Sequence, residues 1–450
     1  MSTSTSALPL LASDLSAAMP DEASAQARTS GNWLRTTLWV VPILTATLFA
    51  KIAVPPLGAQ GIGIALPILL ALTLMGCITQ QFTIAAGRFA FGALVLGLLG
   101  TVQLLKNDVY SLSSLLLLSA LHMPFLLRLR GEPWDIDRAV RFFLAVCTVC
   151  ACCGIAQAAL RGLVETQWLF PIDSFIPEQF LIQNFNEVAP LEYGSTVIRA
   201  NGVFMMEPSY LSQLLAVAII VELVTRNRWW LWSLYGIAML VSYSGTGFMV
   251  LGLCVPVVLL TQQRWGLLVA MVVGGLLFGV IVENFGQYLY LDTFMARTGE
   301  FNSTGSSGFA RFVGGFYLFD QFLWDQPLRA LIGTGAGTFK EYAPLAHFPV
   351  AEMPLFKMVL EFGLLGALLY FSFLFFCLSS SALPGPVALA VGATFLLNGL
   401  YVPFSHALAL TLLVWTSLPS GVRRSQFIRA RETTERIAAR APAIAEEVPV

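Results

Sequence analysis

Long apolar runs constrain the fold of this chain more than any other feature. A helix needs about 20 apolar residues to cross roughly 30 Å of hydrocarbon, and the sequence holds about 12 candidate segments. Hydrophobic residues make up 57% of the 450 and charged residues 11%, and the mean hydropathy is +0.75. This composition predicts an all-α, polytopic integral membrane protein. The candidate segments are residues 36–53, 61–79, 87–105, 109–127, 142–160, 205–225, 229–243, 247–262, 266–282, 354–378, 386–401 and 404–418.

Basic residues are unequally divided between the connections. With a cytoplasmic N-terminus, sixteen Lys and Arg residues fall on the cytoplasmic side and eight outside, while Lys357 lies within a span. Since basic residues favour the cytoplasmic side, both termini are expected there. We predict a disordered cytoplasmic tail at 1–35, a transmembrane helical domain at 36–420 and a basic cytoplasmic tail at 421–450.

Two long external loops are expected, at about 161–204 and 284–353. Long loops with polar content are where binding and catalysis concentrate. The formal net charge of −1 gives no field that would gather nucleic acid, so no nucleic-acid partner is expected. The cytoplasmic connections have no room for a nucleotide-binding domain.

The seven cysteines all fall in apolar stretches. Cys147, Cys150, Cys152 and Cys153 include a C-x-x-C spacing, but no matching pair of ligands exists elsewhere. Small packing residues in a membrane helix explain them better. We expect no metal and no cofactor.

The first external loop ends in Arg199, followed by Glu207-Pro208-Ser209 and a new apolar segment. Pro208 suits the first turn of a helix, and we expect Ser209 and Ser212 to accept from early N–H groups. One interpretation is a simple helix cap with an interfacial Glu–Arg pair. The other is an anion site for a lipid phosphate, built from Arg199 and the helix N-terminus.

The second external loop holds three arginines and a glycine-rich stretch. The arginines, Arg297, Arg311 and Arg329, either contact lipid headgroups or nearby acidic residues, or bind a diphosphate, for which the guanidinium fork is suited. The glycines, Gly333, Gly335 and Gly337, either form a turn or present backbone amides to phosphate or sugar hydroxyls.

Titratable residues close this loop. His347 is either simply solvated or a base near neutral pH. Glu352, Lys357 and Glu361 mark the first turns of the next span, where ionisable groups tend to be functional or mutually paired. Lys357 and Glu361 are four residues apart, which predicts a pair on one helix face.

These motifs resemble those of the O-antigen ligase and Wzy-type polysaccharide polymerase superfamily. The resemblance lies in Pro-Leu-x-x-x-x-Gly-x-Gly-x-Gly-x-Phe at Pro327 to Phe339 and in Glu-x-Gly-x-x-Gly at Glu361 to Gly366. Phe204 to Ser212 resembles the Phe-x-x-Glu-Pro-Ser segment of exopolysaccharide polymerases, and Ser244 to Gly247 gives further support.

The resemblance implies a metal-independent glycosyltransferase of the bacterial inner membrane, with its active site on the periplasmic face. Such an enzyme joins undecaprenyl-diphosphate-linked oligosaccharide repeat units of an exopolysaccharide or O-antigen, without nucleotide sugar. Arg199, Arg297 and Arg311 would hold the diphosphate of the donor and neutralise its charge as it leaves, and Arg311 is also a candidate catalytic residue. Glu207, Arg329, the three loop glycines, Lys357 and Glu361 are the remaining candidates for substrate binding. Chain-length regulator and export proteins are further candidate partners.

One departure from the ligase pattern favours a polymerase. Ligases usually have a histidine nine residues before the Glu of Glu-x-Gly-x-x-Gly, whereas this chain has Glu352 there and His347 five residues upstream. Glu352 is therefore the first candidate base and His347 the second. The alternatives are a ligase that transfers finished glycan to lipid A core or protein, and a transporter or flippase of a lipid-linked solute.

Overall fold

The structure is a computed structural model that describes residues 22–55, 62–105, 110–130, 136–183, 185, 188, 190, 198–285 and 302–417. Helices dominate it. The first half contains α2 (Glu22–Ala46), α3 (Ala65–Ile78), β1 (Phe82–Ile84), α4 (Ala86–Leu105), α5 (Leu112–His122), η2 (Met123–Leu126), β2 (Leu127–Leu129), α6 (Ile136–Ala159), α7 (Thr166–Leu169), α8 (Pro171–Phe175) and η3 (Glu178–Phe180). The second half contains α9 (Pro208–Thr225), α10 (Trp229–Val241), α11 (Gly245–Thr261), α12 (Trp265–Phe285), α14 (Ser307–Phe312), α15 (Gly314–Phe322), α16 (Pro327–Ile332), α17 (Phe339–Tyr342), η6 (Ala343–Leu345), α18 (Pro354–Ser379), α19 (Gly385–Leu397), α20 (Pro403–Ala409) and the π-helical turn η7 (Leu410–Val414).

Each of the twelve predicted apolar segments overlaps one of these helices. Among the described residues, α4, α6, α9 and α18 are long and apolar enough to cross a membrane, and seven further apolar helices are shorter. The mostly helical membrane protein expected from the sequence is therefore confirmed. The number of spans stays a prediction, as do the outside positions of the two long loops and the division into tails and domain.

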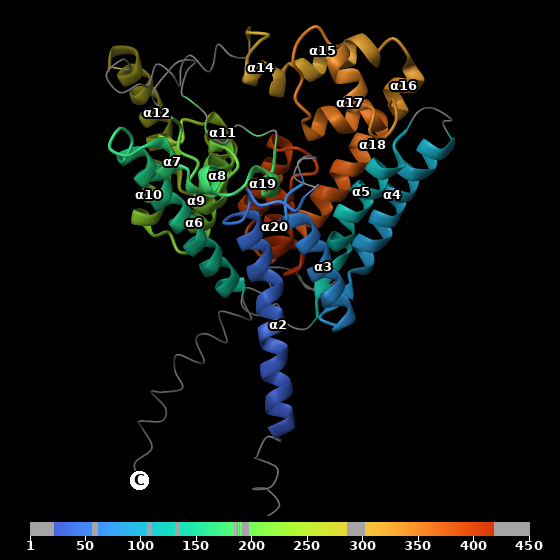
Figure 1. Cartoon of the computed structure of the whole chain (residues 1–450), viewed down its shortest axis with the longest axis horizontal. Coiled ribbons are helices and arrows are strands. Elements are labelled where there is room, and N and C mark those ends of the chain that lie inside the picture. Colours follow the sequence, from blue (N-terminus) through green and yellow to red (C-terminus); the bar gives the residue numbers. More distant parts are fainter. Residues whose placement is uncertain are drawn as a thin grey trace, which may run out of the picture.

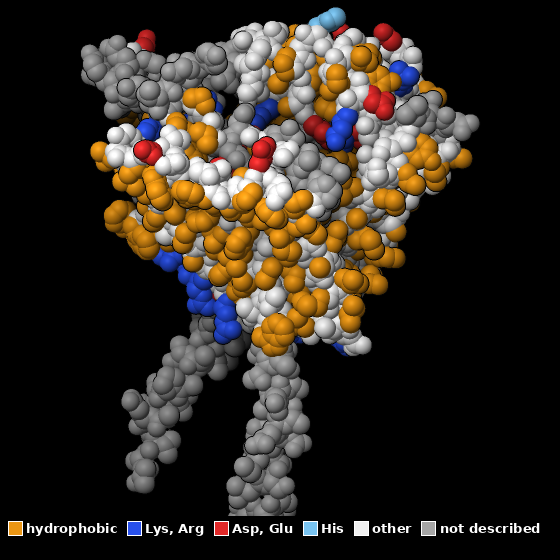
Figure 2. Space-filling model, in the orientation of Figure 1, with side chains coloured by type: hydrophobic (Ala, Val, Ile, Leu, Met, Phe, Trp, Pro, Cys, Tyr) orange, Lys and Arg blue, Asp and Glu red, His pale blue; other side chains and the backbone are white. Residues whose placement is uncertain are grey.

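The helices form a bundle with distinct ends (Figure 1). The short helices α7 and α8 and the group α14 to α17 lie at one end, which we call the loop end, while α2 projects from the other. Hydrophobic side chains form a broad belt around the middle of the molecule (Figure 2). In this view Asp and Glu side chains lie at the loop end, whereas Lys and Arg side chains also line the opposite end. This distribution is the one expected if the loop end faces outward.

At the end opposite the loop end, β1 pairs antiparallel with β2, with Phe82 opposite Leu129. Arg88, at the start of α4, is buried beside this pair and donates to the carbonyls of Val414 and Leu127. A buried guanidinium is tolerated because its donors are satisfied. Arg88 thereby ties the final helical turn to the two-stranded sheet.

α9 is the most deeply buried of the long helices, and every residue from Pro208 to Glu222 is buried. Close approach of a small residue fixes its packing against α11: a Cβ on Gly247 would meet Ser212 Oγ at 2.2 Å. Small residues at such crossings are how membrane helices gain contact without a hydrophobic driving force. Ser212 donates to the Ser244 carbonyl and accepts from Gly247 N–H, so our expectation that it caps α9 was wrong.

α19 and α20 form a short hairpin in the middle of the bundle (Figure 1). The 13 residues of α19 span only about 20 Å at 1.5 Å per residue, less than the hydrocarbon thickness. At its tip, residues 398–402, Asn398 and Leu400 are buried, whereas Gly399, Tyr401 and Val402 are partly exposed. Asn398 and Gln213 of α9 exchange two side-chain hydrogen bonds, at 3.1 and 2.9 Å, which hold this tip in place.

Candidate functional site

A first charged cluster joins the start of α9 to the end of α14. Glu207 has the extended conformation of an N-cap, and α9 begins at Pro208 as expected for proline. Arg311 Nη2 donates to Glu207 Oε2 at 3.2 Å, and Ser209 Oγ donates to the same oxygen at 3.0 Å. Ser209 was expected to cap α9 and instead orients this carboxylate. The Arg311 side chain is 28% exposed, so a ligand can reach its guanidinium.

Gln157, near the end of α6, holds the turn that leads to Glu207. Its Oε1 accepts from the N–H groups of Asn201 and Gly202 at 3.1 and 2.8 Å. Val203 follows with φ +70°, a conformation that costs a β-branched residue about 1–3 kcal/mol. Such strain persists only where neighbouring contacts fix the backbone, and Gln157 supplies them. The sequence analysis missed this residue, whose only signal is an amide in an otherwise apolar segment.

A second charged cluster lies at the start of α18. Lys357 Nζ contacts Glu352 Oε1 at 2.8 Å and Glu361 Oε1 at 2.7 Å. Lys357 and Glu361 are fully buried, whereas the Glu352 side chain is 32% exposed. The predicted Lys357–Glu361 pair is thus confirmed. The cluster contains two carboxylates and one ammonium. Of the two carboxylates, only that of Glu352 is accessible.

α18 is broken directly after this cluster. Gly363 has φ +70° and ψ −178°, outside the helical region, and a Cβ there would meet the Leu331 backbone at 2.3 Å. Gly333, in the loop before α18, contacts the same backbone. It has φ +83°, and a Cβ there would lie only 2.3 Å from the Glu361 carbonyl oxygen. Glycine is required at both positions because of the positive φ and of the backbone contact.

The segment 333–337 satisfies polar groups that the break exposes. Thr334 N–H donates to the Leu360 carbonyl at 2.7 Å and Gly335 N–H to the Glu361 carbonyl at 3.0 Å. Ala336 N–H donates to Gln103 Oε1 at 3.1 Å. Irregular backbone at membrane depth needs such internal partners. The turn interpretation of this segment therefore accounts for these three N–H groups, and contact of Gly333, Gly335 or Gly337 with substrate stays a prediction.

The same segment also holds the Glu361 side chain. Phe339 N–H donates to Glu361 Oε1 at 3.2 Å, the oxygen that also contacts Lys357 Nζ. A carboxylate buried in this way is tolerated only when charge and donors compensate it. The glycine motif and the Glu-x-Gly-x-x-Gly motif, separate in sequence, therefore form one structural unit around Glu361.

The two charged clusters are neighbours through the backbone. Ala351 N–H donates to the Ala310 carbonyl at 2.9 Å. Glu352 is the residue after Ala351, and Arg311 is the residue after Ala310. A potential base and a potential anion-binding arginine consequently stand in adjacent segments at the loop end. This arrangement is suited to a reaction between a hydroxyl and a phosphate-bearing donor.

Four predicted residues remain, of which the structure describes Arg199, Arg329 and His347. Arg199 is partly buried before the turn that Gln157 holds, and Arg329 lies in α16. His347 is exposed, and among the described residues no hydrogen bond or ion pair joins it or Arg329 to either cluster. Arg297 falls outside the described residues. The roles of all four stay predictions.

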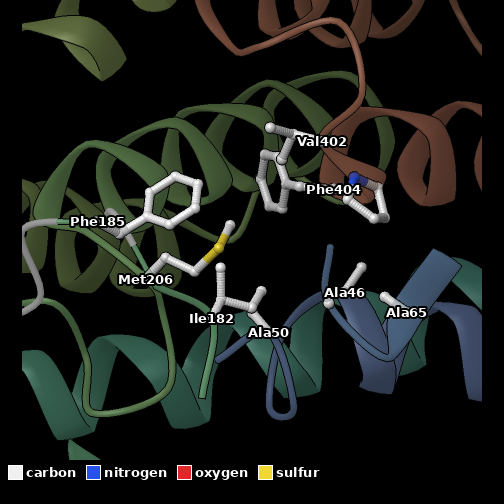
Figure 3. A pocket seen from close by; sticks show the side chains of 10 residues that line it. Ala46, Ala50, Ala65, Ile182, Phe185, Met206, Val402 and Phe404 are labelled. Carbon is white, nitrogen blue, oxygen red and sulfur yellow. The ribbon is translucent and has the colours of Figure 1, made fainter. Parts of the chain in front are cut away.

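A small apolar pocket, with space for about one water molecule, opens between Met206 and Val402 (Figure 3). Met206 and Phe185 face Val402 and Phe404 across it, above Ile182 and three alanines. Met206 precedes Glu207, and Val402 follows Tyr401, whose ring lies 5.0 Å from Lys357 Nζ. Its walls have no charged side chain. The ten lining residues are Ala46, Ala50, Gly63, Ala65, Ile182, Phe185, Met206, Val402, Pro403 and Phe404.

The model of the WcaD colanic acid polymerase family matches residues 36–385, which is more than three quarters of the chain. The chain belongs to the WcaD colanic acid polymerase family. No curated protein and no solved structure matches it. The resemblance to Wzy-type polysaccharide polymerases is thereby confirmed, and this member of the family is a polysaccharide polymerase of exopolysaccharide synthesis with glycosyltransferase-type activity.

Proposed function

We propose that the chain joins oligosaccharide repeat units linked to undecaprenyl diphosphate, at the periplasmic face of the bacterial inner membrane. The observation that supports this most directly is the adjacency of Arg311 and Glu352 at the loop end, set by the Ala310–Ala351 hydrogen bond. One segment offers a permanently charged anion ligand and the other an accessible carboxylate. The family name suggests colanic acid or a related exopolysaccharide as the product.

Arg311 binds the diphosphate of the donor in this proposal, with Arg199 and Arg297 as further ligands. A guanidinium offers a rigid fork of N–H donors that suits phosphate oxygens. Glu207 and Ser209 orient this fork before the donor arrives, so little reorganisation is needed when charge develops on the leaving group.

Glu352 acts as the general base. It takes the proton of an acceptor sugar hydroxyl while the hydroxyl oxygen forms a bond to the anomeric carbon of the donor. The bond between that carbon and the diphosphate oxygen breaks, and undecaprenyl diphosphate leaves with the electron pair. The step as written needs neither a metal nor a nucleotide. His347 is the second candidate base, and its exposed position on the loop leaves it available.

Lys357 and Glu361 position Glu352. Lys357 holds the Glu352 carboxylate at 2.8 Å, and Glu361 balances the ammonium from the buried side. Without Glu361, the single positive charge would act on Glu352 alone and weaken its pull on a proton. Lys357 and Glu361 thus hold the Glu352 carboxylate in place and leave it basic enough to take a proton.

The test compares glycans in a deletion strain. Deleting the gene should remove polymer and accumulate single lipid-linked repeat units, and the wild-type chain should reverse both effects. Glu352→Gln should fail to restore polymer, whereas the matched control Glu341→Gln, an exposed residue of α17, should restore it. Full-length lipid-linked polymer in the deletion strain would indicate a ligase instead. An unchanged glycan profile would favour the transporter alternative instead.

A further inference from the structure

Tyr401, at the tip of the α19–α20 hairpin, lies against the second charged cluster although no motif points to it. Its ring centroid is 5.0 Å from Lys357 Nζ, and its electrostatic neighbours are Glu361 and Glu352. The family match ends at residue 385, before this hairpin tip. The ring is only partly buried, so a ligand that reaches Glu352 can also reach Tyr401.

The hairpin tip is fixed relative to Glu352. Val402 N–H donates to the Gly399 carbonyl at 3.0 Å, which closes a turn around Tyr401. A Cβ on Gly399 would lie 4.0 Å from the Glu352 carbonyl oxygen, so the tip lies close to the backbone of the candidate base. Asn398 anchors the start of this turn through Gln213 and through Ser405 Oγ at 3.1 Å.

We propose that Tyr401 is a positioning residue of the acceptor subsite, whose hydroxyl hydrogen-bonds the acceptor sugar beside Glu352. This inference rests on the proposed function and extends it from the donor to the acceptor. A phenol both donates and accepts, so it can hold a sugar hydroxyl while leaving its proton to a carboxylate. Correct placement of two reactants contributes much of an enzyme's rate, and a rigid tip supplies it.

A purely structural role predicts something different. A ring 5.0 Å from an ammonium can simply stabilise that charge by a cation–π interaction. Phenylalanine retains this interaction and lacks only the hydroxyl, while leucine lacks both. The pair Tyr401→Phe and Tyr401→Leu therefore separates the two roles.

The experiment uses the full chain in lipid vesicles with lipid-diphosphate-linked repeat units extracted from the deletion strain. We measure the rate of transfer from a fixed amount of these lipids against the concentration of a soluble repeat-unit oligosaccharide as acceptor, and binding at the donor diphosphate site by the thermal shift that undecaprenyl diphosphate causes. Tyr401→Phe should keep the wild-type melting temperature and donor shift but raise the KM for acceptor at least tenfold. The control Tyr317→Phe, an exposed tyrosine of α15, should match wild type.

Three outcomes would overturn the inference. Wild-type acceptor kinetics in Tyr401→Phe would show that the hydroxyl has no role, even if Tyr401→Leu is unstable. Loss of the donor shift in Tyr401→Phe would place the residue in the donor site. A wild-type chain that binds donor but releases no polymer would refute the proposed function, and the acceptor subsite with it.

Discussion

Arg311 and Glu207 form an ion pair at 3.2 Å although 104 positions separate them in the chain. Glu207 ends the segment before α9, and Arg311 belongs to the segment between α12 and α18. The pair therefore joins the two long polar segments at the loop end. Since both side chains are partly exposed, its contribution to stability is modest, and its importance lies in holding a guanidinium ready for a ligand.

Replacing Arg311 should impair the reaction more than the fold. We expect Arg311→Ala to slow polymer formation about 100- to 1,000-fold, the effect of removing one donor from a preorganised anion site. Arg311→Lys should recover part of this loss, because an ammonium keeps the charge without the fork. The measurement is the rate of chain extension in vesicles, with the melting temperature recorded in parallel.

Lys340→Gln, at an exposed position of α17, is the matched control for removing a positive charge from the same segment. It should extend chains at the wild-type rate. Equal slowing in Arg311→Ala and Lys340→Gln would mean that the segment acts only through its overall charge.

The buried pair of Lys357 and Glu361 predicts a non-additive response. Lys357→Met leaves the Glu361 carboxylate buried without its counter-ion, which should destabilise the protein by about 3–5 kcal/mol. Adding Glu361→Gln should restore most of that stability, since the remaining amide can still bond Phe339 N–H. Activity should not return, because Glu352 has lost the ammonium that holds it.

Unfolding of the two single variants and the double variant in detergent measures this coupling. Additive losses of stability would show that the two side chains do not depend on each other.

Local patterns predicted part of this site and missed the rest for physical reasons. Apolar length located the helices, and the spacing of four predicted the Lys357–Glu361 pair, because both depend on neighbouring residues. Partners distant in sequence have no such pattern, so Gln157, Tyr401 and the Arg311–Glu207 pair were not found. The glycine motif was noticed, but its packing on Gly363 depends on how two segments approach each other.

The contact between Gly333 and Gly363 predicts that neither residue tolerates a side chain. Alanine at Gly363 should cost about 1–3 kcal/mol from the positive φ alone, and more from its collision with the Leu331 backbone at 2.3 Å. We expect Gly363→Ala and Gly333→Ala to lower both folded yield and melting temperature. Gly252→Ala on α11, with nothing within 4 Å of the added Cβ, is the control. Unchanged melting of Gly363→Ala would argue against the break in α18.

Glu352 and His347 compete for the role of base, and their positions predict the result. Glu352 is held by Lys357 at 2.8 Å and lies one residue from the bond to Ala310, whereas His347 is exposed on the loop. Catalysis requires a group fixed within hydrogen-bond reach of the proton that it takes. We therefore expect Glu352→Gln to slow chain extension about 100- to 10,000-fold, the range for loss of a general base, while His347→Gln changes the rate less than threefold. Donor binding, measured by thermal shift, should persist in both variants because the diphosphate ligands are intact. The reverse order of rates would move the base to His347 and leave Glu352 as a structural partner of Lys357.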